Sequence, residues 1–238
     1  MLSTRLLDRQ FVAEGTMAFG LEKPAGFTFK PGQNVDLTLL DPPQTDAGGN
    51  IRTFSLAGDP ADAALTVATR MRDTAFKRVF QSMPLGSALS LDGPHGDLTL
   101  PNRTNRTIVL LAGGIGITPF RPMALQAARE KLAHRIYLFY GNRRPEDAAF
   151  LHELMALPHQ NPRFTCVAVM SEMEKSSRPW DGPRGLIDAG LLARHLRDAV
   201  EPLYYIAGPP GMVAALRATL NASGVNDDDI RVEEFAGY

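Results

Sequence analysis

The chain has 238 residues, of which 44% are hydrophobic and 21% charged, and its formal net charge is -1. This balance is typical of a globular protein large enough for two domains, and no basic stripe suited to nucleic acid is present. A single cysteine, Cys166, excludes internal disulfides and any metal or iron–sulfur site built from several thiolates, and we expect it to be a buried strand residue. No apolar run reaches the roughly 20 residues that span a bilayer, and no signal-peptide core is seen, so the sequence predicts a cytoplasmic protein.

The first hundred residues consist of short apolar runs separated by turn residues. Alternation across Val35, Leu37 and Leu39 predicts a half-buried strand. Further strands are expected over 52–57, 64–70 and 88–91, and one short helix over 74–81. Many short strands with little helix favour an antiparallel Greek-key β-barrel, which we assign to residues 1–103.

After residue 103 strands and helices alternate. The predicted strands cover 108–111, 136–140, 164–170, 203–206 and 229–235. The predicted helices cover 119–131, 146–155, 188–195 and 211–221. This βαβ repetition predicts a parallel sheet, so we assign residues 104–238 to an α/β nucleotide-binding domain.

The turn after the strand at 108–111 carries three glycines in four positions, Gly113, Gly114 and Gly116. Glycines let the backbone turn sharply and approach a ligand, and the helix that follows offers free N–H groups to a pyrophosphate. The pattern is Gly-x-Gly-x-x-Pro, where a dehydrogenase has a third glycine, so an ordinary strand-to-helix turn with a helix cap is the alternative.

A second cluster of chemically informative residues lies on the strand at 52–57. Arg52 can bind a pyrophosphate through its planar fork, and Phe54 can lie against a planar ring system. Ser55 can hydrogen-bond a ring nitrogen that gains and loses a hydride.

With these segments the sequence resembles the ferredoxin-NADP reductase superfamily of flavoproteins. The resemblance extends over almost the whole chain and rests on segments in the family's order. These are residues 29–33, 52–55, 93–96, 113–119, 140–143 and 208–212.

The resemblance implies FAD in the barrel, held by the segment Arg52, Thr53, Phe54 and Ser55. Arg52 would pair with the flavin phosphate, Phe54 would pack on the isoalloxazine, and Ser55 would lie near the flavin N5 atom. Thr74, at the start of the barrel helix, would meet the pyrophosphate, although helix capping alone also explains it. Thr69 and Arg70 are weaker candidates for the ribityl and adenylate portion.

The resemblance also implies NADH or NADPH at the carboxyl edge of the parallel sheet, with Thr118 close to the nicotinamide. The residues that would bind this dinucleotide are Gly114, Gly116, Thr118, Arg143, Gly208, Pro209 and Met212. The alternative for these positions is a tight turn and a stiff loop. This chain departs from the family at Ala207, where a cysteine is usual, and that change should slow or reshape hydride transfer without abolishing it.

Members of this family commonly end with a glutamate and an aromatic residue placed against the flavin. Here Glu233 and Phe235 match best, and Tyr238 could cover the ring as a lid. The alternative is an edge strand with a frayed tail.

These residues together predict an FAD-dependent NAD(P)H oxidoreductase in which Ser55 and a glutamate, Glu233 or Glu234, handle the N5 proton. The acceptor would be separate, either a ferredoxin, flavodoxin or cytochrome, or a small molecule. A flavin-binding electron-transfer or regulatory subunit without turnover is the alternative, and a pure nucleotide-binding module is disfavoured by residues 52–55. Arg143 and Arg144 follow the second strand of the nucleotide domain, but Glu172 after the third favours NADH over NADPH, although Lys175 and Arg178 could compensate.

Overall fold

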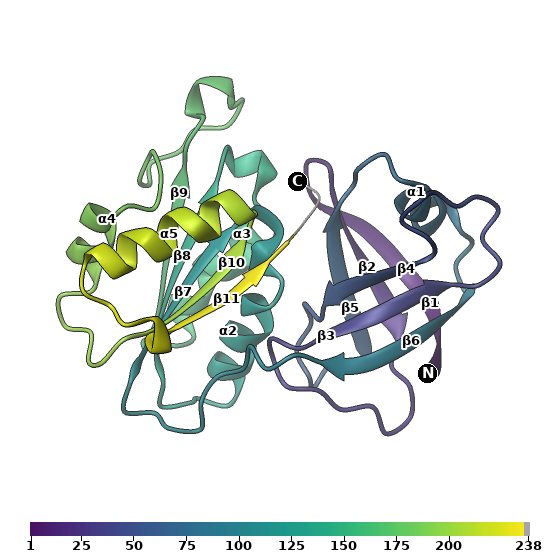
Figure 1. The fold of residues 1–238 in the computed structure, drawn as a ribbon, viewed down its shortest axis with the longest axis horizontal. Helices are drawn as coiled ribbons and strands as arrows, with labels where there is room; N and C mark the ends of the chain where they lie inside the picture. Colours follow the sequence, from purple (N-terminus) through teal and green to yellow (C-terminus); the bar gives the residue numbers. More distant parts are fainter. Residues whose placement is uncertain (236–238) are drawn as a thin grey trace.

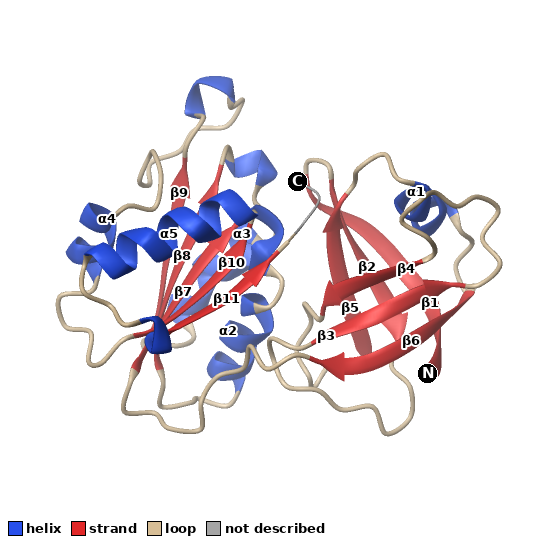
Figure 2. Ribbon diagram, viewed as in Figure 1, coloured by secondary structure: helices blue, strands red, loops and turns tan. Residues whose placement is uncertain are grey.

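The computed structural model describes residues 1–235, which form two units lying side by side (Figure 1). The first unit contains a six-stranded antiparallel sheet, and the second a five-stranded parallel sheet with helices on both faces (Figure 2). Residues 96–106 join the two sheets, and the division expected at residue 103 falls within this segment.

The first unit is a closed barrel, as predicted. Its elements are β1 (Leu2–Ala13), β2 (Thr16–Glu22), β3 (Asn34–Leu39), β4 (Ile51–Ser55), β5 (Ala64–Arg70), α1 (Ala75–Ser82) and β6 (Ala88–His95). The strand order is β4-β3-β6-β1-β2-β5, so β2 and β3 are consecutive in the chain but not paired, as in a Greek key. The two end strands meet through an antiparallel bridge between Leu56 and Val67, which closes the barrel.

The strands β1 and β2 were not predicted from the sequence, although β1 pairs with both β2 and β6. Two register shifts in the β1–β2 ladder, between Leu6 and Asp8 and between Phe11 and Ala13, break the alternation that marks a strand. At the first of these shifts, the Asp8 carboxylate accepts a hydrogen bond from the Gly20 N–H at 3.1 Å. Charged residues therefore occupy this segment without disrupting the sheet.

The barrel core is aromatic, and α1 supplies part of it. Phe76 and Phe80 of α1 are buried, and the Phe80 ring stacks on Phe19 of β2 at 3.9 Å between centroids. Stacked aromatic pairs add about 0.5–1.5 kcal/mol to the free energy of area burial. The packing fixes α1, and therefore the position of its N-terminus, against the barrel.

The second unit is a three-layer α/β sandwich, also as predicted. Its strands are β7 (Thr107–Gly113), β8 (Arg135–Asn142), β9 (Phe164–Met170), β10 (Leu203–Gly208) and β11 (Ile230–Glu234), in the order β11-β10-β7-β8-β9. Its helices are α2 (Phe120–Arg129), α3 (Leu151–Ala156), α4 (Ala189–His195) and α5 (Pro210–Ala222). The chain leaves β7 toward β8 on one side and returns as β10 on the other, which makes the carboxyl ends of β7 and β10 a topological switch point.

The helix predicted over 146–155 is wrong in its first half. A 3-10 turn covers Pro145–Asp147, and α3 begins only at Leu151 because Phe150 has a left-handed backbone with φ of 59°. The Glu146 carboxylate accepts hydrogen bonds from the N–H and hydroxyl of Ser177 at 2.7 and 2.8 Å. These contacts hold Glu146 against the loop after β9 instead of in a helix.

Two arginines of α2 hold the units together. Arg121 donates to the Ala57 carbonyl at 2.6 Å and pairs with Glu153. Arg129 makes a two-pronged ion pair with Asp59 at 2.8 and 2.9 Å. Burial raises the pKa of Asp59, but the bonds to Arg129 outweigh it and the net pKa lies below the ordinary value, so the pair persists at neutral pH.

Cys166 lies on β9 and is half-buried, not fully buried as expected. Burial raises the pKa of its thiol to about 12, so the thiol is unreactive at neutral pH.

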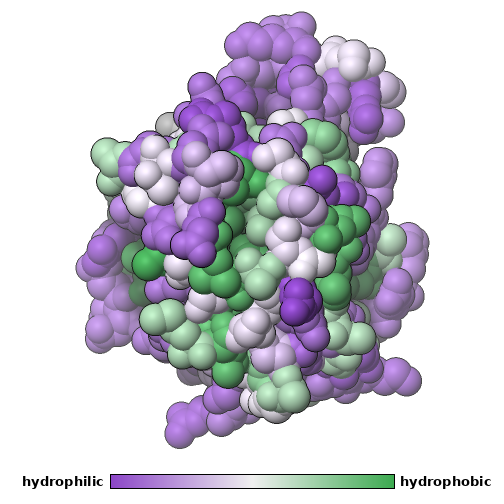
Figure 3. Space-filling model, turned by 90° about the vertical axis from the view of Figure 1, so that its right-hand side faces the viewer, coloured by the Kyte–Doolittle hydropathy of each residue, from purple (hydrophilic) through white to green (hydrophobic). Residues whose placement is uncertain are grey.

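No helix within residues 1–235 is long and apolar enough to cross a membrane, and these residues contain no acidic, histidine or cysteine cluster suited to a metal ion. Viewed toward the barrel end, the surface shows apolar side chains scattered among hydrophilic ones (Figure 3).

Candidate functional site

A cavity of about 640 Å³ lies at the carboxyl edge of the parallel sheet. Both units line it, because Arg70 and Arg72 of the barrel face the loops that end the parallel strands. The expected residues in its wall are Gly114, Arg143, Pro209 and Met212. A cavity at a topological switch point with cations beside glycine turns is suited to a dinucleotide.

Two glycines allow the loops over this cavity to pack closely. A Cβ on Gly113 would lie 2.2 Å from the Met212 sulfur and 3.1 Å from Pro209 Cδ, so glycine at the end of β7 lets Pro209 and the first turn of α5 pack closely on it. Gly208 has φ of +155°, a conformation that side chains rarely adopt. Gly208 therefore shapes the loop, while Pro209 and Met212 supply its surface.

Gly116 packs closely on the neighbouring strand β10. A Cβ there would lie 2.1 Å from the Ala207 carbonyl oxygen, a backbone atom that cannot move aside. Gly116 is buried and is not among the residues that line the cavity. Its absence of a side chain therefore permits packing of the turn on β10, and its contact with a dinucleotide stays a prediction.

Thr118 is also engaged inside the turn. Its hydroxyl donates to the Ile115 carbonyl at 2.9 Å, and only 1% of the residue is exposed. The hydroxyl therefore stabilises the 3-10 turn Gly114–Ile117, and a contact with a nicotinamide ring would have to share or replace that bond.

Some of the polar and charged residues after β8 and β9 line the cavity, and others form ion pairs outside it. Arg143 lines the cavity, whereas Arg144 turns toward the barrel and pairs with Asp147 and Glu14. Ser171 lines the cavity next to Glu172, which pairs with Lys175 at 2.7 Å. The bond from Lys175 lowers the pKa of Glu172, so this carboxyl is ionised at neutral pH.

The start of α1 forms an anion site in the barrel. Asp46, in the loop between β3 and β4, accepts a hydrogen bond from the Ala75 N–H at 2.7 Å and lies 3.5 Å from the Arg52 guanidinium. The Thr74 hydroxyl caps the same helix by accepting from the Lys77 N–H at 3.4 Å. A carboxylate thus stands where the resemblance expects a phosphate, so these residues fit an anionic group.

The other expected flavin residues of the barrel have different surroundings. Phe54 is 6% exposed and packs in the barrel core against Phe76 and Phe80, with ring centroids 5.9 and 6.0 Å away. Thr53 points to the opposite face, as alternation along β4 requires, and bonds Asp36. Thr69 is 8% exposed. In the structure Thr53 and Phe54 both make contacts within the barrel, and their contact with a flavin stays a prediction.

Ser55 and Glu233 meet across the two units, as expected. The Ser55 hydroxyl donates to Glu233 Oε1 at 3.3 Å, whereas Glu234 is exposed. Burial raises the pKa of Glu233, an effect that the Ser55 bond partly opposes. The Phe235 N–H donates to the Gly208 carbonyl at 3.0 Å, which holds Phe235 beside the loop that follows β10. Tyr238 lies outside the described residues.

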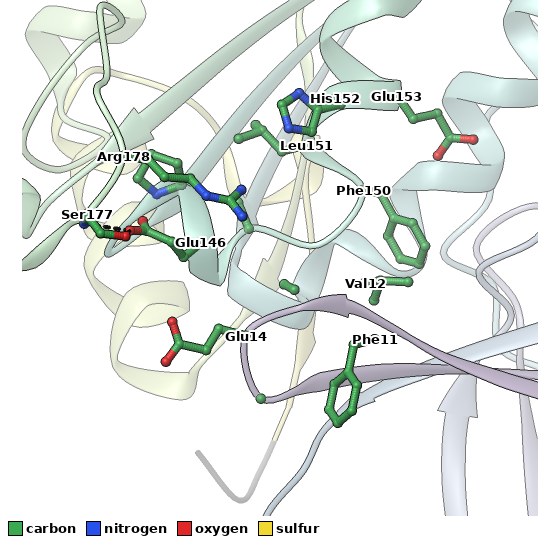
Figure 4. Close-up of a pocket in the computed structure, with 14 residues that line it drawn as sticks. Phe11, Val12, Glu14, Glu146, Phe150, Leu151, His152, Glu153, Ser177 and Arg178 are labelled. Carbon is green, nitrogen blue, oxygen red and sulfur yellow. Dashed lines mark hydrogen bonds between the residues drawn. The ribbon is translucent and has the colours of Figure 1, made fainter.

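A further cavity, of about 770 Å³, separates the β1–β2 hairpin from α3 (Figure 4). Phe11 and Glu14 line one side, and Phe150 and His152 the other, with the Glu146–Ser177 bond at its rim. None of the residues predicted for the site lies in its wall.

Some lining residues of the nucleotide cavity were missed from the sequence. Leu186 and Ile187 lie in the segment between β9 and α4, which carries no motif. Arg72 lies in a loop without periodicity, as does Asp46, which bonds the start of α1, and the sequence offers no signal for either.

Comparison with known proteins agrees with this geometry. Residues 110–218 match the family described as oxidoreductase NAD-binding domain. The chain is 25% identical over 223 residues to the glycine betaine monooxygenase reductase subunit of Chromohalobacter salexigens, covering 92% of this chain and 60% of that protein. It is 27% identical over 219 residues to the propane 2-monooxygenase reductase component of Rhodococcus jostii, covering 90% and 57%.

Among solved structures, the fold matches a ferredoxin NADP+ reductase from Neisseria gonorrhoeae, solved with bound FAD and NADP, with a TM-score of 0.79. The match covers 98% of both chains at 22% identity, so it shows the fold alone. The chain spans about 60% of the length of the two curated relatives named above.

Proposed function

We propose that this chain, whose residues 110–218 match an oxidoreductase NAD-binding domain and whose fold matches that of a ferredoxin NADP+ reductase, is an FAD-dependent NAD(P)H oxidoreductase. It takes a hydride from the reduced nicotinamide and passes electrons to a separate acceptor. FAD supplies the redox chemistry when bound, because its ring accepts a hydride and releases electrons singly or in pairs.

The observation that carries the proposal is the cavity formed by both units. Arg70 and Arg72 approach the glycine loops from the barrel side, so a dinucleotide in the cavity touches the barrel as well as the parallel sheet. The reacting ring of the dinucleotide can then lie at the interface, where Ser55 and Glu233 meet.

The flavin phosphates belong at the start of α1. Arg52 supplies the guanidinium, Ala75 the backbone N–H, and Thr74 the cap. Charge-assisted bonds of this kind are about twice as strong as neutral ones.

The Ser55–Glu233 pair holds a proton beside the expected ring position. Because burial raises the pKa of Glu233, its carboxyl keeps a proton to higher pH than an exposed glutamate does. Ser55 orients that carboxyl and can relay the proton. A glutamate at this place therefore serves as a local proton store.

The acceptor is a separate protein in this proposal. Both relatives named above are named as the reductase subunit or reductase component of a monooxygenase, and a reductase that is one part of a larger system supports a separate acceptor. An ionised Glu172 beside Ser171 disfavours a 2′-phosphate, so NADH is the proposed donor.

Steady-state oxidation of NADH and NADPH with ferricyanide tests this function. The proposal expects turnover of FAD-loaded protein with a higher kcat/KM for NADH. Flavin binding without any turnover would instead identify an electron-transfer or regulatory subunit.

Lys77 predicts a pH dependence of FAD binding. Its ammonium donates to the Arg70 carbonyl at 2.7 Å, and burial, aided by Arg72 and Arg52, lowers its pKa to about 8. A bound diphosphate favours the charged form, so FAD affinity should fall as pH rises above about 8. Fluorescence titration at pH 7 and pH 9.5 should show about tenfold weaker binding at the higher value.

The thermal stability of the apoprotein should change with pH in the direction opposite to that of FAD affinity. Because the native lysine releases its proton before the unfolded one does, thermal stability should rise with pH between about 8 and 10.5. Lys77→Met should flatten both profiles. An equally steep loss of affinity in that variant would assign the pH dependence to another group.

A further inference from the structure

The loop between β3 and β4, residues 40–50, is held on α1 at two points. At the helix start, the Asp46 carboxylate accepts from the Ala75 N–H at 2.7 Å and from the Gly48 N–H at 3.0 Å. One turn later, Gln44 accepts from the Arg78 guanidinium at 3.0 and 3.3 Å. The loop thus lies along the helix that the flavin diphosphate needs.

Arg52 is turned into the same loop. It donates to the carbonyls of Gly48, Gly49 and Ile51, and its guanidinium lies 3.5 Å from Asp46. A Cβ at position 48 would lie 2.4 Å from Arg52 Nη2, so a side chain there would displace the Arg52 guanidinium from this loop. The donors expected to bind phosphate are therefore occupied by the protein itself.

From these contacts we infer that Asp46 is an internal substitute for a flavin phosphate, and that FAD loads by displacing it. The inference rests on the proposed function. A carboxylate and a phosphate oxygen both accept from a helix N-terminus and from arginine, so they compete for one site. The side chain of Asp46 keeps 36% exposure, which leaves it free to exchange with a ligand.

The physical consequence is an opposed effect on stability and affinity. In the apoprotein Asp46 satisfies a helix N–H and compensates the charge of Arg52, and these contacts hold its pKa below the ordinary value. With FAD bound, the same carboxylate is a negative charge beside a diphosphate. Removing it should weaken the apoprotein and strengthen FAD binding.

The test compares Asp46→Asn and Asp46→Ala with the wild type, using apoprotein freed of flavin. We expect the melting temperature of the apoprotein to fall by about 2–4 °C in the alanine variant. We expect the FAD affinity of the alanine variant, measured by quenching of flavin fluorescence, to be about tenfold higher than that of the wild type. The affinity of the asparagine variant should lie between those of the wild type and the alanine variant. Riboflavin, which lacks phosphates, should bind all three proteins equally.

Asp73→Asn is the matched control, because Asp73 lies next to the same helix start but pairs with the exposed Arg78. It removes the same charge without freeing the Ala75 N–H, so it should change FAD affinity much less. Equal or weaker FAD binding by Asp46→Ala, or equal tightening by Asp73→Asn, would overturn the inference while leaving the proposed function intact. Failure of the wild type to bind FAD at all would refute both.

Discussion

Gly116→Ala should destabilise the second unit by about 3 kcal/mol, which lowers the melting temperature by about 10 °C in a chain of this size. The added Cβ would meet the Ala207 carbonyl oxygen at 2.1 Å, and it would be attached to the turn after β7 where that turn packs on the backbone near the end of β10. Either the turn or β10 must move to relieve the overlap. Thermal unfolding followed by circular dichroism measures the effect.

Gly211→Ala is the control for this prediction. Gly211 lies in the first turn of α5, also at the nucleotide cavity, and a Cβ there meets no atom within 4 Å. Its melting temperature should stay the same or rise slightly, since alanine favours a helix. If both variants have the same melting temperature, close packing does not explain why position 116 is a glycine.

Arg52→Gln should weaken FAD binding about 100-fold. The substitution removes the guanidinium that lies beside the start of α1 and keeps a side chain of similar length. Its effect should be absent for riboflavin, because the lost contact is to phosphate. Fluorescence titration of the apoprotein with both compounds measures the difference.

Arg5→Gln is the matched variant, since Arg5 lies exposed on β1 and donates to the Gly86 carbonyl. It removes one positive charge from the barrel without touching the start of α1. Comparable losses of FAD affinity in both variants would point to overall charge and would contradict a phosphate contact by Arg52.

The fold could be predicted where local patterns matched tertiary structure. Val35, Leu37 and Leu39 alternate along β3 because every second side chain is buried. The apolar runs of the parallel strands arise because both faces of that sheet are covered. Those strands therefore lie where expected. The failures have equally specific causes. Two bulges interrupt the alternation of β1, and the left-handed backbone of Phe150 shortens α3.

The candidate site was predictable at the ends of strands and not within loops. Gly114, Arg143, Pro209 and Met212 follow parallel strands, and the geometry of such sheets gathers them around one cavity. The resemblance implied that Ser55 acts with a glutamate, Glu233 or Glu234, and the structure shows the bond to Glu233. By contrast, the packing contacts of Gly116 and Phe54 join residues far apart in the sequence, so the sequence could not predict them.

The central claim is that a flavin bound by the barrel takes a hydride from a reduced nicotinamide bound by the second unit. Anaerobic titration of the FAD-reconstituted protein with NADH, followed by visible absorption, tests it most directly. The account predicts that FAD stays with the protein through gel filtration and that its long-wavelength band bleaches with one equivalent of NADH. Flavin that elutes free, or a band that persists under excess NADH and NADPH, would contradict it.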